Sequence, residues 1–66
     1  MHISKRLKEL RIENNFSQEK LAEILNVSRQ TISNWENERS YPDVHNLIML
    51  CDIYSVSLNT LMKGDI

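Results

Sequence analysis

The chain has 66 residues, with eight Lys and Arg, nine Asp and Glu, and a formal net charge of −1 at pH 7. This length suits one domain, which we expect to span residues 1–66, and so small a domain buries only about 60% of its unfolded surface. The single Cys excludes an internal disulfide, and one Gly and one Pro argue against hairpins and long loops. The composition therefore predicts an all-α domain held by local contacts.

The charges are unevenly distributed along the chain. Residues 1–40 hold seven of the eight cations, whereas residues 41–66 are net acidic. This bias is weak, and it limits the non-specific affinity for nucleic acid, which depends on cations that neutralise phosphates. No apolar run approaches the roughly 20 residues of a membrane span. The N-terminus leads into a charged amphipathic stretch without a signal sequence, so we expect a cytoplasmic protein with no membrane segment.

The first predicted helix begins near Ile3, because Ile3, Leu7 and Leu10 recur at helical spacing. Ser4 is a candidate N-cap for this helix. We expect the helix to end near Asn14–Asn15, since Asn tolerates a left-handed backbone.

Three later helix starts share one pattern, in which an apolar residue precedes a Ser and another follows four residues after it. The three serines are Ser17, Ser28 and Ser57. Ser is a preferred N-cap, and the flanking apolar pair can form a hydrophobic staple. The pattern predicts helices that begin at about residues 18, 29 and 58, the last running from Leu58 to Lys63 with Gly64 after its end.

A further helix is predicted after Pro42, with Asp43 as its N-cap. Its expected core-facing stripe follows i, i+3, i+4, i+7 spacing. The stripe comprises Val44, Leu47, Ile48, Cys51 and Tyr54. We expect Cys51 to be a small buried apolar residue in a reducing compartment, and His45 to be exposed.

Residues 18–37 read as two helices joined by a tight turn at residues 25–28. Asn26 is expected to adopt a positive φ in this turn, and Ala22 allows the helices to approach closely. The other inward-facing apolar residues are Leu21, Leu25, Val27, Ile32 and Trp35.

The opposite face of the second of these helices carries only polar side chains. If Ser28 caps the helix and Ile32 and Trp35 face the core, helical periodicity leaves a polar row on the outside. That row is Arg29, Gln30, Ser33, Asn34 and Asn37. Such a row is either a solvated surface or a surface for reading DNA bases, because Arg can pair with guanine and Gln or Asn with adenine.

The 18–37 segment resembles the helix-turn-helix of the Cro and phage-repressor (XRE) family of transcriptional regulators. The resemblance rests on Gln18 at the start of the first helix and on apolar or small residues at the family's expected positions, and it extends over essentially the whole chain. These positions are Leu21, Ala22, Leu25, Val27, Ile32 and Trp35. Asn26, where Gly is commonest, and the slightly acidic net charge depart from the family pattern. The resemblance implies a compact five-helix bundle of the lambda-repressor-like type that binds double-stranded DNA.

The resemblance also implies which residues contact DNA. Arg29, Gln30 and Asn34 of a recognition helix over residues 29–37 would read bases in the major groove. Gln18 and Asn37 would hold phosphates, and Arg39 in the following loop is a further phosphate candidate. The complete set of expected DNA-contacting residues is Gln18, Ser28, Arg29, Gln30, Ser33, Asn34, Asn37 and Arg39.

Glu36 does not fit a DNA-facing role, because its carboxylate would repel phosphate. A pair linking the first helix to this position occurs in the family, so we expect an ion pair between Arg11 and Glu36 that orients the two helices. The alternative is an exposed pair of little energetic consequence.

No other chemistry is indicated. His2, His45, Cys51 and Asp52 lack the paired spacing of a metal site, and the serines are better explained as helix caps. We predict no enzyme activity and no cofactor.

The predicted function is sequence-specific regulation of transcription, with repression as the expected sense. We expect a homodimer on an inverted-repeat operator, joined through the loop at Ser40–Tyr41 and the last helix (Leu58, Met62, Ile66), although these apolar residues could equally belong to the core. The alternative function is an antitoxin-like or partner-binding module that has lost DNA binding, which the absence of a basic excess keeps open.

Overall fold

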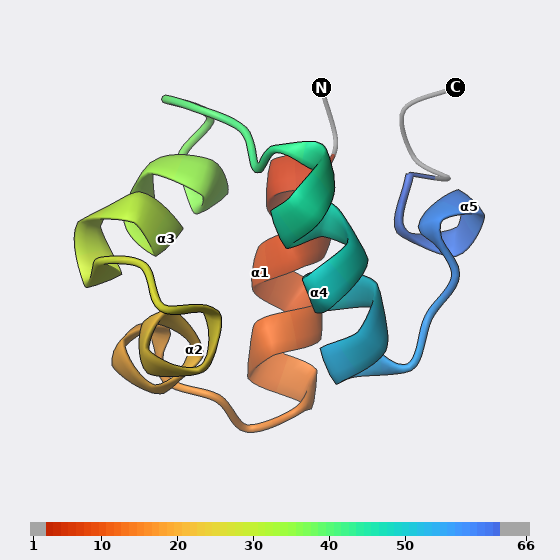
Figure 1. Ribbon diagram of the computed structural model, residues 1–66, viewed down its shortest axis with the longest axis horizontal. Coiled ribbons are helices and arrows are strands. Elements are labelled where there is room, and N and C mark those ends of the chain that lie inside the picture. The colour runs from red at the N-terminus through yellow and green to blue at the C-terminus, as the bar shows by residue number, and fades with distance from the viewer. Residues whose placement is uncertain (1–2, 63–66) are drawn as a thin grey trace.

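The computed structural model describes residues 3–62, which form five helices and no strand (Figure 1). The predicted all-α, five-helix fold is confirmed. The helices are α1 Ile3–Glu13, α2 Gln18–Leu25, α3 Arg29–Glu36, α4 Val44–Tyr54 and α5 Leu58–Leu61. None of the helices within this range is long and apolar enough to cross a membrane.

Helix α1 lies in the middle of the domain (Figure 1). The α2–α3 pair lies on one side of it and α5 on the other, and α1 contacts both α3 and α5. Because α2 and α3 pack against each other, the two helices of the 18–37 segment form one unit supported by α1.

Four helices begin at the predicted N-caps. The side-chain oxygens of Ser17, Ser28, Asp43 and Ser57 each accept a hydrogen bond from the backbone N–H three residues later. Each bond satisfies one of the orphan donors of a first helical turn, which is why these residues define where the helices start. The prediction for Ser4 was wrong: this residue lies within α1, it is buried, and its Oγ has no hydrogen-bond partner among residues 3–62.

The connections after four helices use left-handed residues other than glycine. Asn15 and Asn26 have φ of 62° and 57°, as predicted, and Glu38 and Ser55 have φ of 61° and 54°, which the sequence did not indicate. In the α4–α5 connection the Val56 N–H returns to the carbonyl of Cys51 at 3.0 Å, so the left-handed residue before it closes the helix end. The predicted end of the fifth helix, at Lys63 and Gly64, lies outside the described residues.

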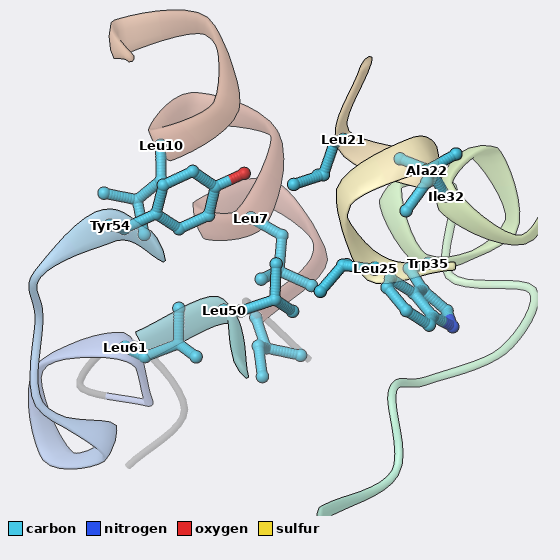
Figure 2. Close-up of a cluster of buried hydrophobic side chains, with 11 residues drawn as sticks. Leu7, Leu10, Leu21, Ala22, Leu25, Ile32, Trp35, Leu50, Tyr54 and Leu61 are labelled. Carbon is cyan, nitrogen blue, oxygen red and sulfur yellow. The ribbon is translucent and has the colours of Figure 1, made fainter. Parts of the chain in front are cut away.

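The hydrophobic core is shared by all five helices (Figure 2). Leu7 and Leu10 of α1 lie beside Leu50 and Tyr54 of α4, while Ala22 lies against Ile32 at the α2–α3 crossing, as Figure 2 shows. The buried apolar residues are Ile3, Leu7, Leu10, Leu21, Ala22, Leu25, Ile32, Trp35, Leu50, Tyr54 and Leu61.

The predicted core stripe of α4 was only partly correct. Tyr54 is buried, and Leu47 and Cys51 are half-buried against the core, but Val44 and Ile48 are 71% and 54% exposed. Apolar residues occur on nearly every side of this helix, so periodicity alone could not identify the buried side. The structure instead buries Leu50, which lies beside Leu7 of α1 in Figure 2.

Candidate nucleic-acid interface

The turn between α2 and α3 is built by local hydrogen bonds and one apolar contact. Asn26 adopts the left-handed conformation, and its N–H and that of Val27 return to the carbonyls of Glu23 and Ala22. Val27 packs against the core, and Ser28 then caps α3. Because both sides of the turn are anchored, α3 leaves α2 in a single direction and its outer face is defined.

The outer face of α3 carries the predicted polar row. Ile32 and Trp35 are buried on the inner side, whereas Arg29, Gln30 and Asn37 are exposed. Ser33 and Asn34, on the same face, are half-buried. The structure therefore brings the five side chains of the row onto one surface.

Three hydrogen bonds along this row link residues one helical turn apart. Gln30 Nε2 donates to Asn34 Oδ1 at 3.0 Å. Asn37 Nδ2 donates to the carbonyl and to the hydroxyl of Ser33, at 2.8 and 3.2 Å. The amide nitrogen of Asn37 is thus turned toward two acceptors of Ser33, so in the free protein this amide caps the end of α3.

The N-terminal end of α3 presents a hydroxyl and a guanidinium. Ser28 Oγ accepts the Thr31 N–H at 3.1 Å and lies 2.9 Å from the Thr31 hydroxyl, so its principal role is the cap. Arg29 follows it and is exposed. At the other end, Arg39 is exposed just after α3, and its backbone N–H bonds to the carbonyl of Asn34 at 2.9 Å.

Glu36 is removed from the outer surface by a hydrogen-bonded network. Its Oε2 accepts from Arg11 Nε at 2.7 Å and its Oε1 from Arg11 Nη2 at 3.2 Å. Gln18 Nε2 donates to the same Oε1 at 3.1 Å, and Arg11 Nη1 donates to the carbonyl of Phe16 at 2.8 Å. The side chains of Arg11 and Glu36 are only 12% and 3% exposed, so the pair lies within the fold and not on its surface.

This network determines the orientation of the Gln18 side-chain amide. A carboxylate only accepts hydrogen bonds, so the Gln18 amide must turn its nitrogen toward Glu36. One amide hydrogen and the amide oxygen remain for other partners. The N-terminus of α2 is thereby tied to the C-terminus of α3.

Tyr54 borders the same network, a placement that the sequence did not indicate. Burial and the Glu36 carboxylate raise the pKa of Tyr54 to about 12, an effect that Arg11 partly opposes. The hydroxyl has no hydrogen-bond partner among residues 3–62. The ring lies 6.2 Å from that of Phe16, centroid to centroid, so α4 covers the network through its last turn.

Outside α3 and the Arg11–Glu36 network, the reactive side chains of residues 3–62 are not gathered into a metal site. Within residues 3–62 no three His, Cys, Asp or Glu side chains gather as metal ligands, and His45 is exposed. Cys51 is half-buried, less than predicted, and burial together with the Asp52 carboxylate raises the pKa of its thiol. A protonated thiol is a poor nucleophile and a poor metal ligand.

Comparison with known proteins agrees with this geometry. The model of the helix-turn-helix family matches residues 7–61, so the chain belongs to that family, as predicted. The family is one of transcriptional regulators and not of enzymes.

Three relatives match almost the whole chain. The transcriptional activator BcrR of Enterococcus faecalis is 38% identical over 65 residues, which are 98% of this chain and 32% of that protein. The transcriptional regulator ImmR of Bacillus subtilis (strain 168) is 37% identical over 98% of this chain and 51% of its own length. The uncharacterized SPbeta prophage-derived regulator YonR of the same strain is 36% identical over 89% of this chain and 55% of its own length. The chain therefore spans between about a third and somewhat over half of these relatives.

Proposed function

We propose that the chain binds double-stranded DNA sequence-specifically, with α3 in the major groove, and so regulates transcription. The observation that carries this proposal is the outer face of α3: a row of polar side chains with base-pairing chemistry, from which the single acidic residue of the helix is withdrawn. Burial of Glu36 removes from this face a charge that would repel DNA phosphates. The relatives named as transcriptional regulators support the same conclusion.

Base reading is assigned to Arg29, Gln30 and Asn34. Arg can donate two hydrogen bonds to guanine O6 and N7, and an amide can pair with adenine N6 and N7. Arg29 at the start of α3 and Gln30 beside it are the most exposed of the three, as a helix that enters the groove by its N-terminal end requires.

Phosphate contacts are assigned to residues around this face. Gln18, Asn37 and Arg39 flank the ends of α2 and α3, and Ser28 and Ser33 offer hydroxyls beside the base-reading residues. Asn37 would have to exchange its bonds to Ser33 for a phosphate, so we expect its contribution to be smaller than that of Arg39. Such contacts set the register of the protein on DNA without reading sequence.

A homodimer on an inverted repeat would supply the specificity that one small domain lacks, because two half-sites one helical turn apart lie ~34 Å from each other. Exposed apolar side chains in residues 41–58 support this arrangement: Tyr41 and Leu58 are each 49% exposed, and Val44 and Ile48 are more exposed still. Met62, expected in the interface, packs partly against the core, and Ile66 lies outside the described residues.

We propose repression as the sense of regulation, because occupation of an operator excludes other proteins without any further contact. One relative is named an activator, so the sense requires a direct test with a reporter gene downstream of the selected operator. The protein would act in the cytoplasm, where its DNA target lies.

The rival function is a partner-binding module, which the net charge of −1 and the exposed apolar residues of α4 favour. Selection of bound sequences from a random duplex pool at ~100 mM salt separates the two, since the phosphate contribution falls steeply with salt. We expect an enriched inverted repeat. No enrichment at any salt concentration would contradict DNA binding and leave the partner-binding function.

A further inference from the structure

Gln30 and Asn34 are joined by a hydrogen bond on the outer face of α3. Gln30 Nε2 donates to Asn34 Oδ1 at 3.0 Å, one helical turn along. An amide group carries an acceptor oxygen and a donor nitrogen, and on an open surface it can present either one. The bond couples the two amides: reversing Gln30 alone would place two oxygens against each other, so the bond is kept only if both amides reverse together.

We propose that these two residues read one base pair as a unit, in which Gln30 contacts the base and Asn34 is a positioning residue that holds the Gln30 amide in place through this hydrogen bond. This inference rests on the proposed DNA-binding function. It replaces the simpler expectation that each amide reads its own base.

The chemistry of the target base follows from the bond. One hydrogen of Gln30 Nε2 is taken by Asn34, so the other hydrogen and Oε1 remain at the exposed edge of the amide. Adenine presents the complement of that edge in the major groove, with an N6 donor beside the N7 acceptor. The unit is therefore expected to select an A·T pair.

Asn34 is suited to positioning because its side chain is shorter and less exposed than that of Gln30. Asn34 is half-buried, whereas Gln30 is exposed. The longer and more mobile side chain is thus oriented by the shorter one. Holding a side chain in its bound conformation before contact reduces the ordering cost of binding.

The experiment compares three variants of the full chain on the operator selected by the wild type. Gln30→Ala first identifies the base pair that Gln30 reads, as the position where discrimination falls on the order of tenfold or more. Asn34→Leu, which cannot accept a hydrogen bond, should lower discrimination at that same base pair by a similar factor. The double variant should discriminate no worse than either single variant.

Asn34→Asp is the matched control. Its carboxylate still accepts the Gln30 hydrogen bond, so discrimination at the Gln30 base pair should survive while affinity for all sequences falls through repulsion of phosphate. The inference would be overturned if Asn34→Leu lowered discrimination at a different base pair from Gln30→Ala and the two losses added in the double variant. It would also be overturned if Asn34→Asp lost discrimination as completely as Asn34→Leu.

A measurement without DNA separates this inference from the proposed function. NMR relaxation of the Gln30 side-chain amide should give a restricted order parameter in the free wild type and in Asn34→Asp, and one below about 0.6 in Asn34→Leu. Asn34→Ala provides a second variant if Leu disturbs folding. Equal mobility in all forms would overturn the inference with DNA binding intact, whereas a wild type that selects no sequence would overturn the proposed function and the inference with it.

Discussion

Glu36 Oε2 accepts a hydrogen bond from Arg11 Nε at 2.7 Å, which joins α3 to α1 across 25 residues of sequence. A second bond between the same two groups makes the contact bidentate, the geometry in which Arg and a carboxylate interact most strongly. The pair withdraws the acidic residue of α3 from its outer face and leaves that face without negative charge. One contact thus serves both the orientation of α3 and the electrostatics of its surface.

Breaking this pair should be costly, because each single substitution leaves a buried charge without its partner. We expect Arg11→Ala and Glu36→Ala each to lower the free energy of unfolding by about 3 kcal/mol or more, measured by urea unfolding. A domain of this size has a free energy of unfolding of about 3–10 kcal/mol, so that loss would remove between roughly a third and nearly all of its stability.

An exposed ion pair provides the control for this measurement. The side chains of Lys20 and Glu23 are 57% and 74% exposed and approach to 3.7 Å. Lys20→Ala should change the free energy of unfolding by less than about 1 kcal/mol. If Glu36→Ala proved as mild as Lys20→Ala, the orienting role of the Arg11–Glu36 pair would be wrong.

Tyr54 should make the protein less stable in alkali. Its folded pKa of about 12 exceeds the ordinary value of about 10, and the neutral form is the protonated one. The stability associated with this shift is fully present below pH 10 and is lost as the pH rises toward 12, by about 2–3 kcal/mol in total. Tyr54→Phe should remove this part of the alkaline loss, as followed by urea unfolding at pH 7, 10 and 11.

The same variant should not be destabilised at pH 7, since the Tyr54 hydroxyl is buried and has no partner among residues 3–62. Tyr41→Phe is the matched control, because Tyr41 is 49% exposed and should keep the alkaline loss of the wild type. Identical alkaline profiles for the two variants would show that the Tyr54 environment is not as described.

Ser55 occupies a left-handed position that glycine adopts without steric cost. With φ of 54° and an exposed side chain, Ser55→Gly should raise the free energy of unfolding by about 0.5–1 kcal/mol, after the greater flexibility of glycine in the unfolded chain is included. The melting temperature should rise by roughly 2–8 °C.

The contrasting substitution is Ser57→Gly. Ser57 has φ of −79° and caps α5, so glycine there relieves no strain and should lower stability by a few tenths of a kcal/mol. The two substitutions should therefore change the melting temperature in opposite directions. A fall in melting temperature for both would show that Ser55 does not adopt the left-handed backbone conformation.

Arg29 and Arg39 should affect DNA binding in different ways. Arg29→Ala should reduce discrimination at one base pair by about 1–3 kcal/mol, because a base contact is lost. Arg39→Ala should weaken binding to all sequences alike. The slope of log K against log salt concentration should also become less steep, by about the amount that one phosphate contact contributes. Fluorescence anisotropy with the selected operator and its point variants, at several salt concentrations, measures base discrimination and the salt dependence of affinity. If the two protein variants lost discrimination and salt dependence equally, the assignment of Arg29 to a base and Arg39 to a phosphate would be wrong.

The exposed apolar residues of α4 should support dimerisation. Val44→Ser with Ile48→Ser should shift sedimentation equilibrium toward the monomer and weaken binding to the inverted repeat, with affinity for a single half-site retained. Ile12→Ser on α1 is the control, since Ile12 is also exposed, at 56%, but belongs to no proposed interface. A dimer that persists in the α4 variant would place the interface elsewhere.

Sequence reasoning identified the parts of this fold that depend on neighbouring residues. A cap hydrogen bond spans three residues and the α2–α3 turn spans four, so Ser17, Ser28, Asp43 and Asn26 could be interpreted from local patterns alone. The inward positions of Ile32 and Trp35 followed from helical periodicity, because the rest of α3 is polar. The outer row of α3 was predictable for the same reason.

The sequence by itself thus determined where the helices begin, how α2 turns into α3 and which side chains form the outer face of α3. The tertiary structure alone decided which side of α4 is buried, that Tyr54 borders the Arg11–Glu36 pair, and that Gln18 is held by Glu36. The physical reason is the separation along the sequence over which each kind of interaction acts. Caps, turns and periodicity act within about one helical turn, whereas the Gln18–Glu36 and Arg11–Glu36 contacts join residues 18 and 25 positions apart. Only the packing of α3 against α2 and against α1 brings those residues together.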